Sequence, residues 1–183
     1  IITCAHQINR GEYPPLRENK GDLFFLRRRA ADIPDTIVGL CRERLPRNMG
    51  IPAAEIQVLC PTRLYEAGTG NLNTVLQAAL NPPGEEKREK AYGDRVFREG
   101  DRVMQIKNNY DIAWKAPLEW GGDTAEEDKL LVRGAGIFNG DVGVIRAIDP
   151  KTELVTVDFD GRLAQYSTDM LHELEHAFAM TVH

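Results

Sequence analysis

Residues 56–83 of the chain are IQVLCPTRLYEAGTGNLNTVLQAALNPP, and this stretch decides the fold. Residues 56–60 are apolar apart from Gln57 and are followed by Pro61. This predicts a short buried strand closed by proline. Apolar side chains then recur with the spacing of one helix face, at Leu72, Val75, Leu76, Ala79 and Leu80. Thr69 or Asn71 can cap this helix, and Asn81-Pro82-Pro83 ends it. The stretch predicts a strand, a polar loop and a helix.

The same order of elements precedes this stretch. Residues 23–26, Leu-Phe-Phe-Leu, predict a short buried strand. An apolar face from Ile37 to Leu45 predicts a helix that begins near Asp32-Ile33-Pro34-Asp35 and ends at Gly50. Residues 23–83 therefore follow the order strand, helix, strand, helix, which is typical of a parallel sheet covered by helices.

After Pro83 the pattern changes to β. Residues 85–90 form a charged linker that we expect to be solvated. Residues 101–107, 141–148 and 154–159 are rich in Val and Ile and are separated by turn residues, which predicts the short strands of a small barrel. Residues 112–136 contain Trp114, Trp120 and an acidic patch, and we expect them to be an inserted loop.

Composition limits the possible function classes. The 183 residues are 42% apolar, enough for one compact domain or two small ones. The net charge is −5, which excludes a uniformly basic nucleic-acid module. Residues 1–63 carry 10 basic and 7 acidic side chains and residues 64–183 carry 13 and 21, so the positive surface belongs to the α/β half. No apolar run is long enough for a membrane span, and no leader is visible.

The cysteines and the two ends of the chain indicate its origin. Cys4, Cys41 and Cys60 are widely spaced and form no Cys-x-x-Cys pair, which predicts free thiols in a reducing cytoplasm. A helical pattern is already present at Ile1 and stops at Gly11, and the apolar run at 177–182 halts without a terminator. We therefore expect the chain to be a piece excised from a longer protein.

Two catalytic motifs are considered and set aside. Residues 172–176, His-Glu-Leu-Glu-His, match H-E-x-x-H, in which two histidines one helical turn apart bind zinc. We expect the match to be coincidental, because no third ligand follows at the usual spacing. The sequence also has no G-x-x-x-x-G-K-[ST] phosphate loop, so unaided ATP hydrolysis is not expected.

Two groups of loop residues are candidates for contact with a nucleic-acid backbone. Thr62 and Arg63, followed by the loop 68–71, offer a hydroxyl, a guanidinium and free backbone N–H groups at a helix N-terminus. The alternative is a tight turn with a surface arginine. Residues 107–110 and 138–141 offer Lys, Asn and aromatic side chains at the rim of the barrel, where they could stack bases of a single strand. They could equally be plain hairpin turns.

Several motifs in a fixed order carry a family likeness. They are AHQINRGE at 5–12, LCPTR at 59–63, GTGNLN at 68–73, LQAALNP at 76–82, GDRVMQIKNNY at 100–110, FNGDVG at 138–143 and AFAMTVH at 177–183. Together they resemble RecD/TraA-type superfamily-one DNA helicases, a group that includes the exodeoxyribonuclease V alpha chain. The likeness covers nearly the whole chain and fails only across residues 112–136.

The resemblance implies a fold of class α/β plus β. Residues 1–83 would be part of the second RecA-like domain, a P-loop-type parallel-sheet domain. Residues 84–170 would be an inserted SH3-like β-barrel with an extra loop at 112–136. Residues 171–183 would return to the RecA-like domain and open helicase motif V.

The resemblance also implies an activity and its site. The parent would be an ATP-dependent helicase that moves 5′ to 3′ on single-stranded DNA in repair and recombination, with ATP and Mg²⁺ as cofactors. This segment lacks the Walker motifs, so we expect it to hold no cofactor, no metal and no catalytic residue, and to be inactive alone. The implied DNA-binding residues are Thr62, Arg63, Lys107, Asn108, Asn139, Thr181 and His183.

The expected partners are single-stranded DNA, the other RecA-like domain of the same chain and nuclease subunits, with no membrane. Whether the parent acts alone or in a nuclease complex stays open. The alternative function is that of a partner-binding SH3-like module on an α/β scaffold.

Overall fold

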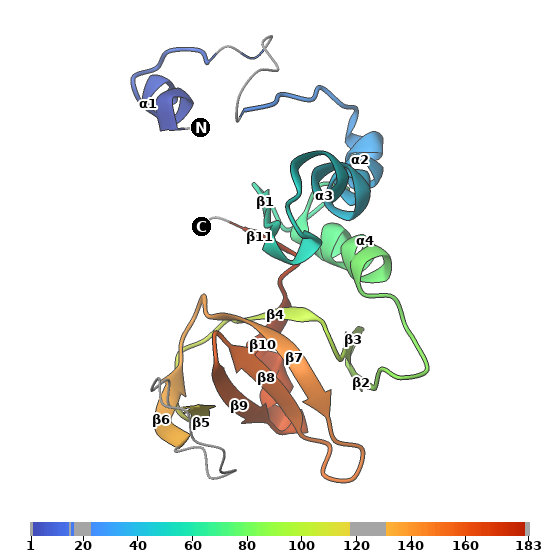
Figure 1. Ribbon diagram of the computed structural model, residues 1–183, viewed down its shortest axis with the longest axis vertical. Helices are drawn as coiled ribbons and strands as arrows, with labels where there is room; N and C mark the ends of the chain where they lie inside the picture. Colours follow the sequence, from blue (N-terminus) through green and yellow to red (C-terminus); the bar gives the residue numbers. More distant parts are fainter. Residues whose placement is uncertain (1, 15, 17–22, 118–130, 182–183) are drawn as a thin grey trace.

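The computed structural model describes residues 2–14, 16, 23–117 and 131–181. Figure 1 shows a helical part with two short strands above a larger sheet. Each part has its own apolar core. In the described ranges, no helix is both long and apolar enough to cross a membrane.

The helical part begins with α1 (Ile2–Asn9), which has no buried residue and is followed by Gly11 at a φ of 77°. The helix expected after Asp32 is a continuous run of η1 (Ala30–Asp32), α2 (Ile33–Gly39), the π-helical turn η2 (Leu40–Arg44) and α3 (Leu45–Met49). Gly50 ends this run in the left-handed conformation, as the sequence predicts. The 3-10 turn η3 (Ala53–Glu55) precedes the first strand.

The prediction of a strand at residues 23–26 is wrong. The structure gives these residues no regular secondary structure, and Phe24 and Phe25 are 50% and 48% exposed. Among the described residues no strand lies beside them. A lone extended segment leaves its backbone N–H and C=O groups unpaired and covers little of its apolar surface, so an apolar run does not form a strand without a neighbour.

A pair of parallel strands lies at the centre of the helical part. β1 (Val58–Cys60) pairs with β11 (Ala179–Thr181), and Cys60 lies opposite Thr181. α4 (Thr69–Leu80) is capped by Gly68, not by Thr69 or Asn71 as predicted. The buried core of this part consists of Cys41, Cys60, Leu72, Leu76, Phe178 and Ala179. The strand beside β1 therefore comes from the far end of the chain.

The second part is a seven-stranded antiparallel sheet. Its strands are β4 (Arg102–Gln105), β5 (Asn109–Pro117), β6 (Leu131–Ile137), β7 (Val142–Ile148), β8 (Val155–Phe159), β9 (Arg162–Tyr166) and β10 (Leu174–His176). They lie in the order β10-β4-β7-β8-β9-β5-β6. The three strands predicted by the Val- and Ile-rich segments are confirmed as β4, β7 and β8. The 3-10 turn η4 (Thr168–Glu173) contributes Leu171 to the core of this part.

Residues 112–136 are not simply a loop, which corrects the prediction for this segment. β5 and β6 extend the sheet and pair with each other, and β5 also pairs with β9. Trp114 packs on the core of the sheet, and a Cβ on Gly134 would clash with its ring. The glycines of β6 hide its strand pattern in the sequence. Residues 118–130, including Trp120, lie outside the described residues.

The charged linker is also more ordered than predicted. β2 (Glu89–Tyr92) and β3 (Arg95–Arg98) form an antiparallel hairpin. Arg98 pairs with Glu89 at 2.6 Å, and Lys90 pairs with Glu153 at 2.9 Å. The first pair joins the two strands of the hairpin and the second attaches the hairpin to the turn before β8, so these charges are not simply solvated.

The cysteines are free, as the sequence predicts, but only two of them are buried. Cys41 and Cys60 lie in the helical core, and burial raises the pKa of both thiols. Both therefore stay protonated and unreactive near neutral pH.

The core of the seven-stranded sheet leaves no space at Gly143. A Cβ there would lie 2.7 Å from the carbonyl oxygen of Asp158 and 2.8 Å from Val157 Cγ1. We expect Gly143→Ala to lower the free energy of unfolding by about 1–3 kcal/mol, because β7 must move away from β8. Gly39→Ala is the control, since nothing lies within 4 Å of its position in α2. Urea unfolding followed by tryptophan fluorescence measures both; equal midpoints would contradict this packing.

Candidate nucleic-acid interface

Asn73 and Gln77 of α4 and its C-cap residue Asn81 have carboxamide side chains at intervals of four residues. Residues four apart lie on one face of a helix, so these side chains form an amide stripe. Leu72 and Leu76, one position before two of the amides, are buried in the helical core. The helix is therefore held to the first part by leucines and presents amides to the second part.

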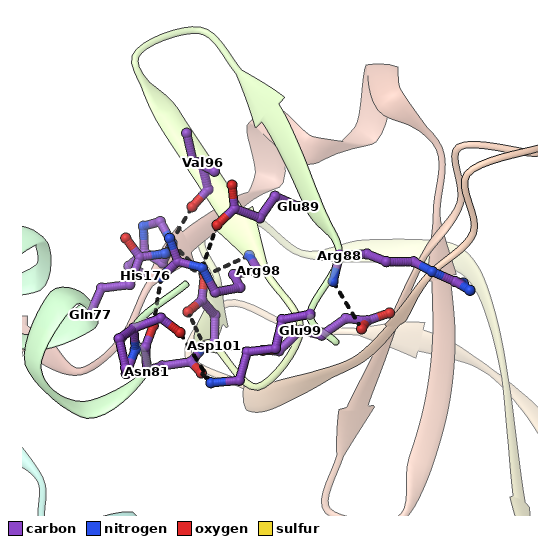
Figure 2. A network of polar contacts seen from close by, with 11 residues as sticks. Gln77, Asn81, Arg88, Glu89, Val96, Arg98, Glu99, Asp101 and His176 are labelled. Carbon is purple, nitrogen blue, oxygen red and sulfur yellow. Dashed lines mark hydrogen bonds and ion pairs between the residues drawn. The ribbon is translucent and has the colours of Figure 1, made fainter. Parts of the chain in front are cut away.

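The centre of the junction is Asp101, whose side chain is fully buried between β3 and β4 (0% exposed). Its Oδ2 accepts hydrogen bonds from Gln77 Nε2 at 2.6 Å and from the backbone N–H of Arg98 at 2.8 Å. Its Oδ1 accepts from Asn81 Nδ2 at 2.7 Å (Figure 2). A buried carboxylate is tolerated only when its oxygens are bonded, so Asp101 fixes α4 against the turn that begins the sheet.

The strand that leaves the sheet joins the same cluster. His176 Nε2 lies 3.1 Å from Asp101 Oδ2. Gln77 Nε2 also donates to Val96 O at 2.8 Å, which uses both of its hydrogens. Because an ionised carboxylate only accepts hydrogen bonds, we place the hydrogen between His176 and Asp101 on the histidine. Asn73 Nδ2 donates to the carbonyl oxygens of His176 and Ala179, both at 2.9 Å.

The β2–β3 hairpin is attached to the C-terminus of α4. The Asn81 carbonyl accepts a hydrogen bond from Arg98 Nη1 at 2.5 Å, and Asn81 Oδ1 accepts one from Lys87 Nζ at 2.6 Å. Cations at this end of a helix are favoured by the carbonyl dipoles. The hairpin, the helix and the first strand of the sheet thus form one continuous polar network (Figure 2).

The loop before α4 places Thr62 and Arg63 just beyond β1. Thr181, opposite Cys60 in β11, is their neighbour across the parallel pair. The Arg63 side chain is 64% exposed, and its Nη1 lies 3.5 Å from Glu175 Oε1. The structure therefore brings three of the predicted site residues to one edge of the helical part. His183, the other site residue predicted for this part, lies outside the described residues.

The backbone N–H groups at the start of α4 are not free, which corrects the prediction for this loop. The N–H groups of residues 68–70 donate to the carbonyl oxygens of Tyr65, Thr62 and Arg63, at 3.0, 3.1 and 3.2 Å. Thr62 Oγ1 also accepts a hydrogen bond, from Leu64 N at 3.2 Å. The tight turn considered as the alternative describes this backbone, so the N–H groups of residues 68–70 are not available to a ligand.

The second candidate surface is the barrel rim, made of Lys107, Asn108, Tyr110, Phe138 and Asn139. Asn139 N donates to Asn108 Oδ1 at 2.9 Å, which joins the two loops. The rings of Tyr110 and Phe138 are T-shaped with centroids 5.5 Å apart, and these residues are 67% and 40% exposed. The structure therefore places all three predicted rim residues beside an exposed aromatic pair.

The rim rests on a buried polar support. Glu173 Oε2 accepts hydrogen bonds from Gln105 Nε2 at 2.8 Å and from Asn109 Nδ2 at 3.0 Å. The Tyr166 hydroxyl donates to Gln105 Oε1 at 2.9 Å. Burial, reinforced by the charge of Glu173, raises the pKa of Tyr166, so this hydroxyl keeps its hydrogen at neutral pH.

Residues 172–176 do not form the helix that the zinc motif requires. They pass from the 3-10 turn η4 into β10, so His172 and His176 do not share a helix face. His176 is bonded to Asp101, and Glu173 supports the rim. In the ranges that the structure describes, no three His, Cys, Asp or Glu side chains are placed to hold a metal.

Comparisons with known proteins identify the second part. Residues 72–159 match the family model described as the ATP-dependent RecD-like DNA helicase SH3 domain. The whole chain is 32% identical to the ATP-dependent RecD2 DNA helicase of Deinococcus radiodurans and spans 21% of the length of that protein. Both matches support a RecD-like helicase fragment. The match to the RecD-like SH3 domain begins at Leu72, so it includes the amide stripe as well as most of the sheet.

The structure gives a physical reason for one motif of this RecD-like chain. In GTGNLN at 68–73 and LQAALNP at 76–82, each amide of the stripe follows a leucine. The leucines at 72 and 76 face the helical core, while the amides bind Asp101 and the strand that returns from the sheet. The four-residue interval of the amides was visible in the sequence. The acceptor that Gln77 and Asn81 share was not, because Asp101 is 20 residues beyond Asn81.

The junction yields a stability prediction. Asp101→Asn keeps the size of the side chain but turns an NH2 group toward donors, which leaves buried polar groups without partners. We expect it to lower the free energy of unfolding by about 1–3 kcal/mol for each lost hydrogen bond. Asp94→Asn, the same change at an exposed hairpin position, should shift it by less than about 0.5 kcal/mol. Matching urea midpoints for the two variants would argue against the role given to Asp101.

Proposed function

We propose that this chain is the part of an ATP-dependent DNA helicase that holds single-stranded DNA, in a protein that moves 5′ to 3′ and acts in repair and recombination. The observation that carries the proposal is the barrel rim. It combines an exposed aromatic pair with Lys107, Asn108 and Asn139. Aromatic faces stack on bases of any sequence, and cationic and amide groups contact the phosphate backbone.

We further propose that residues 1–83 and 171–183 belong to the second RecA-like domain and that residues 84–170 are the SH3-like barrel inserted into it. The parallel pairing of β1 with β11 supports this division, since those strands lie on either side of the barrel in the sequence. In this arrangement Thr62, Arg63, Thr181 and His183 contact DNA or couple it to the nucleotide site. The other RecA-like domain, and in a complex the nuclease subunits, would be the protein partners.

ATP and Mg²⁺ do not fit the residues of this chain. The sequence has no phosphate loop, and the N–H groups of residues 68–70 are bonded within their own turn. We therefore assign both cofactors to other parts of the parent helicase. The contribution of this chain is to grip the strand through side chains.

The rim can be tested by removing its aromatic ring. In a longer protein with both RecA-like domains, Tyr110→Ala should weaken binding of a labelled single-stranded oligonucleotide about fivefold or more, because one stacked base contributes about 1–3 kcal/mol. Tyr13→Ala removes a tyrosine that is 91% exposed outside the barrel and should leave the affinity unchanged. Fluorescence anisotropy measures both. Equal affinities for the Tyr110 variant and the wild type would remove the rim from the DNA path.

Arg63 can be tested through the ATPase. Arg63→Ala in the full-length protein should raise the DNA concentration needed for half-maximal ATPase stimulation and make the salt dependence of DNA binding shallower by about 0.7 in log–log slope. Arg42→Ala, at an exposed position of η2, is the control. If the wild type shows no salt-dependent binding at all, the DNA function is wrong and the partner-binding alternative gains support.

A further inference from the structure

We infer that Arg63 and Arg95 form one binding site for a backbone phosphate, and that Glu175 occupies the anion position of this site when DNA is absent. The inference rests on the proposed function and deepens it, since it adds Arg95 as a DNA contact and makes Glu175 a competitor of the strand. Neither residue belongs to the motifs that predicted the interface.

The geometry around Glu175 is that of two arginines sharing one carboxylate. Arg63 Nη1 lies 3.5 Å and Arg95 Nη2 lies 3.9 Å from the same oxygen, Glu175 Oε1. Charge-assisted hydrogen bonds between these groups are normally about 2.7–2.9 Å long. Both ion pairs are therefore loose, and the single carboxylate satisfies neither guanidinium.

The three side chains line a pocket of about 470 Å³ between α4, the β2–β3 hairpin and β10. Arg63, Arg95 and Glu175 are 64%, 36% and 27% exposed, so solvent and a ligand can reach them. Thr69 and Thr74 also line the pocket, as does the carboxylate of Asp94. Among the described residues no ion pair joins Asp94 to either arginine.

A phosphodiester suits this position better than the carboxylate does. The guanidinium fork matches a phosphate as well as a carboxylate, and two guanidiniums converging on one point favour an anion with more than one free oxygen. A DNA strand that crosses the open pocket offers such an anion. Its phosphate would replace Glu175 between the arginines and leave that side chain free to turn to solvent.

The junction around Asp101 holds the two arginines at a fixed separation. Arg63 precedes α4, while Arg95 opens β3 and donates from Nη1 to Leu174 O at 2.8 Å. Gln77 binds both Val96 O and Asp101, which ties the hairpin to the helix. The two arginines are therefore in place before the DNA binds, and little conformational entropy is lost on binding.

The site predicts opposite effects for its acidic and basic members. In the full-length protein, Arg95→Ala should weaken single-stranded DNA binding at least threefold and make the salt dependence shallower by about 0.7 in log–log slope. Glu175→Gln should strengthen binding two- to fivefold, because the competing anion is gone. Asp94→Asn removes the same charge from the same pocket without contacting either arginine, and it should change the affinity by less than Glu175→Gln does.

Anisotropy titrations of these variants over a range of salt concentrations decide the matter. Arg95→Ala also removes the bond to Leu174, whereas Glu175→Gln breaks no backbone contact and tests the site independently of folding. Weaker binding by Glu175→Gln, or equal gains from Glu175→Gln and Asp94→Asn, would overturn the inference while wild-type DNA binding, and hence the proposed function, still stands. Inorganic phosphate competes for the same two guanidiniums, so it should displace the DNA more than chloride does at equal ionic strength; no such excess would count against a phosphate site here.

Discussion

The structure depends on one buried carboxylate. Asp101 is inaccessible to solvent, and a buried carboxylate must accept hydrogen bonds or destabilise the fold. Its donors come from α4, from the turn at Arg98 and from His176 on β10. These elements are far apart in the sequence. Satisfying one side chain therefore sets how the helix, the hairpin and the two ends of the barrel meet.

Because the junction is polar, its geometry is specific. An apolar contact between the two cores would tolerate sliding, since hydrophobic burial has no direction. Hydrogen bonds from Gln77 and Asn81 to Asp101, and from Asn73 to the returning strand, hold only in one arrangement. This property suits a protein in which the two proposed DNA-contacting surfaces keep a constant spacing.

β10 connects those two surfaces. Glu173, the last residue of η4 just before β10, supports the loops of the barrel rim, and Glu175 in β10 meets Arg63 and Arg95. The two carboxylates are two residues apart, roughly 7 Å along an extended strand. The residues of the apparent zinc motif thus have other roles. Its two glutamates lie along the proposed path of the single-stranded DNA, and His176 belongs to the junction.

The sequence by itself determined the local elements and the family. The leucine spacing of α4, the glycine end at Gly50 and the Val- and Ile-rich strands β4, β7 and β8 depend on neighbours along the chain, so periodicity predicted them. The motifs that contain Lys107, Asn108 and Asn139 also led to the rim.

Only the tertiary structure decided the contacts between distant residues. It left residues 23–26 without a strand partner, made strands of β5 and β6, and closed the N–H groups of residues 68–70 within their own turn. It also brought Arg95 and Glu175 to Arg63. Pairing partners and buried acceptors are set by the packing of segments far apart in the chain, and no periodicity within one segment records them.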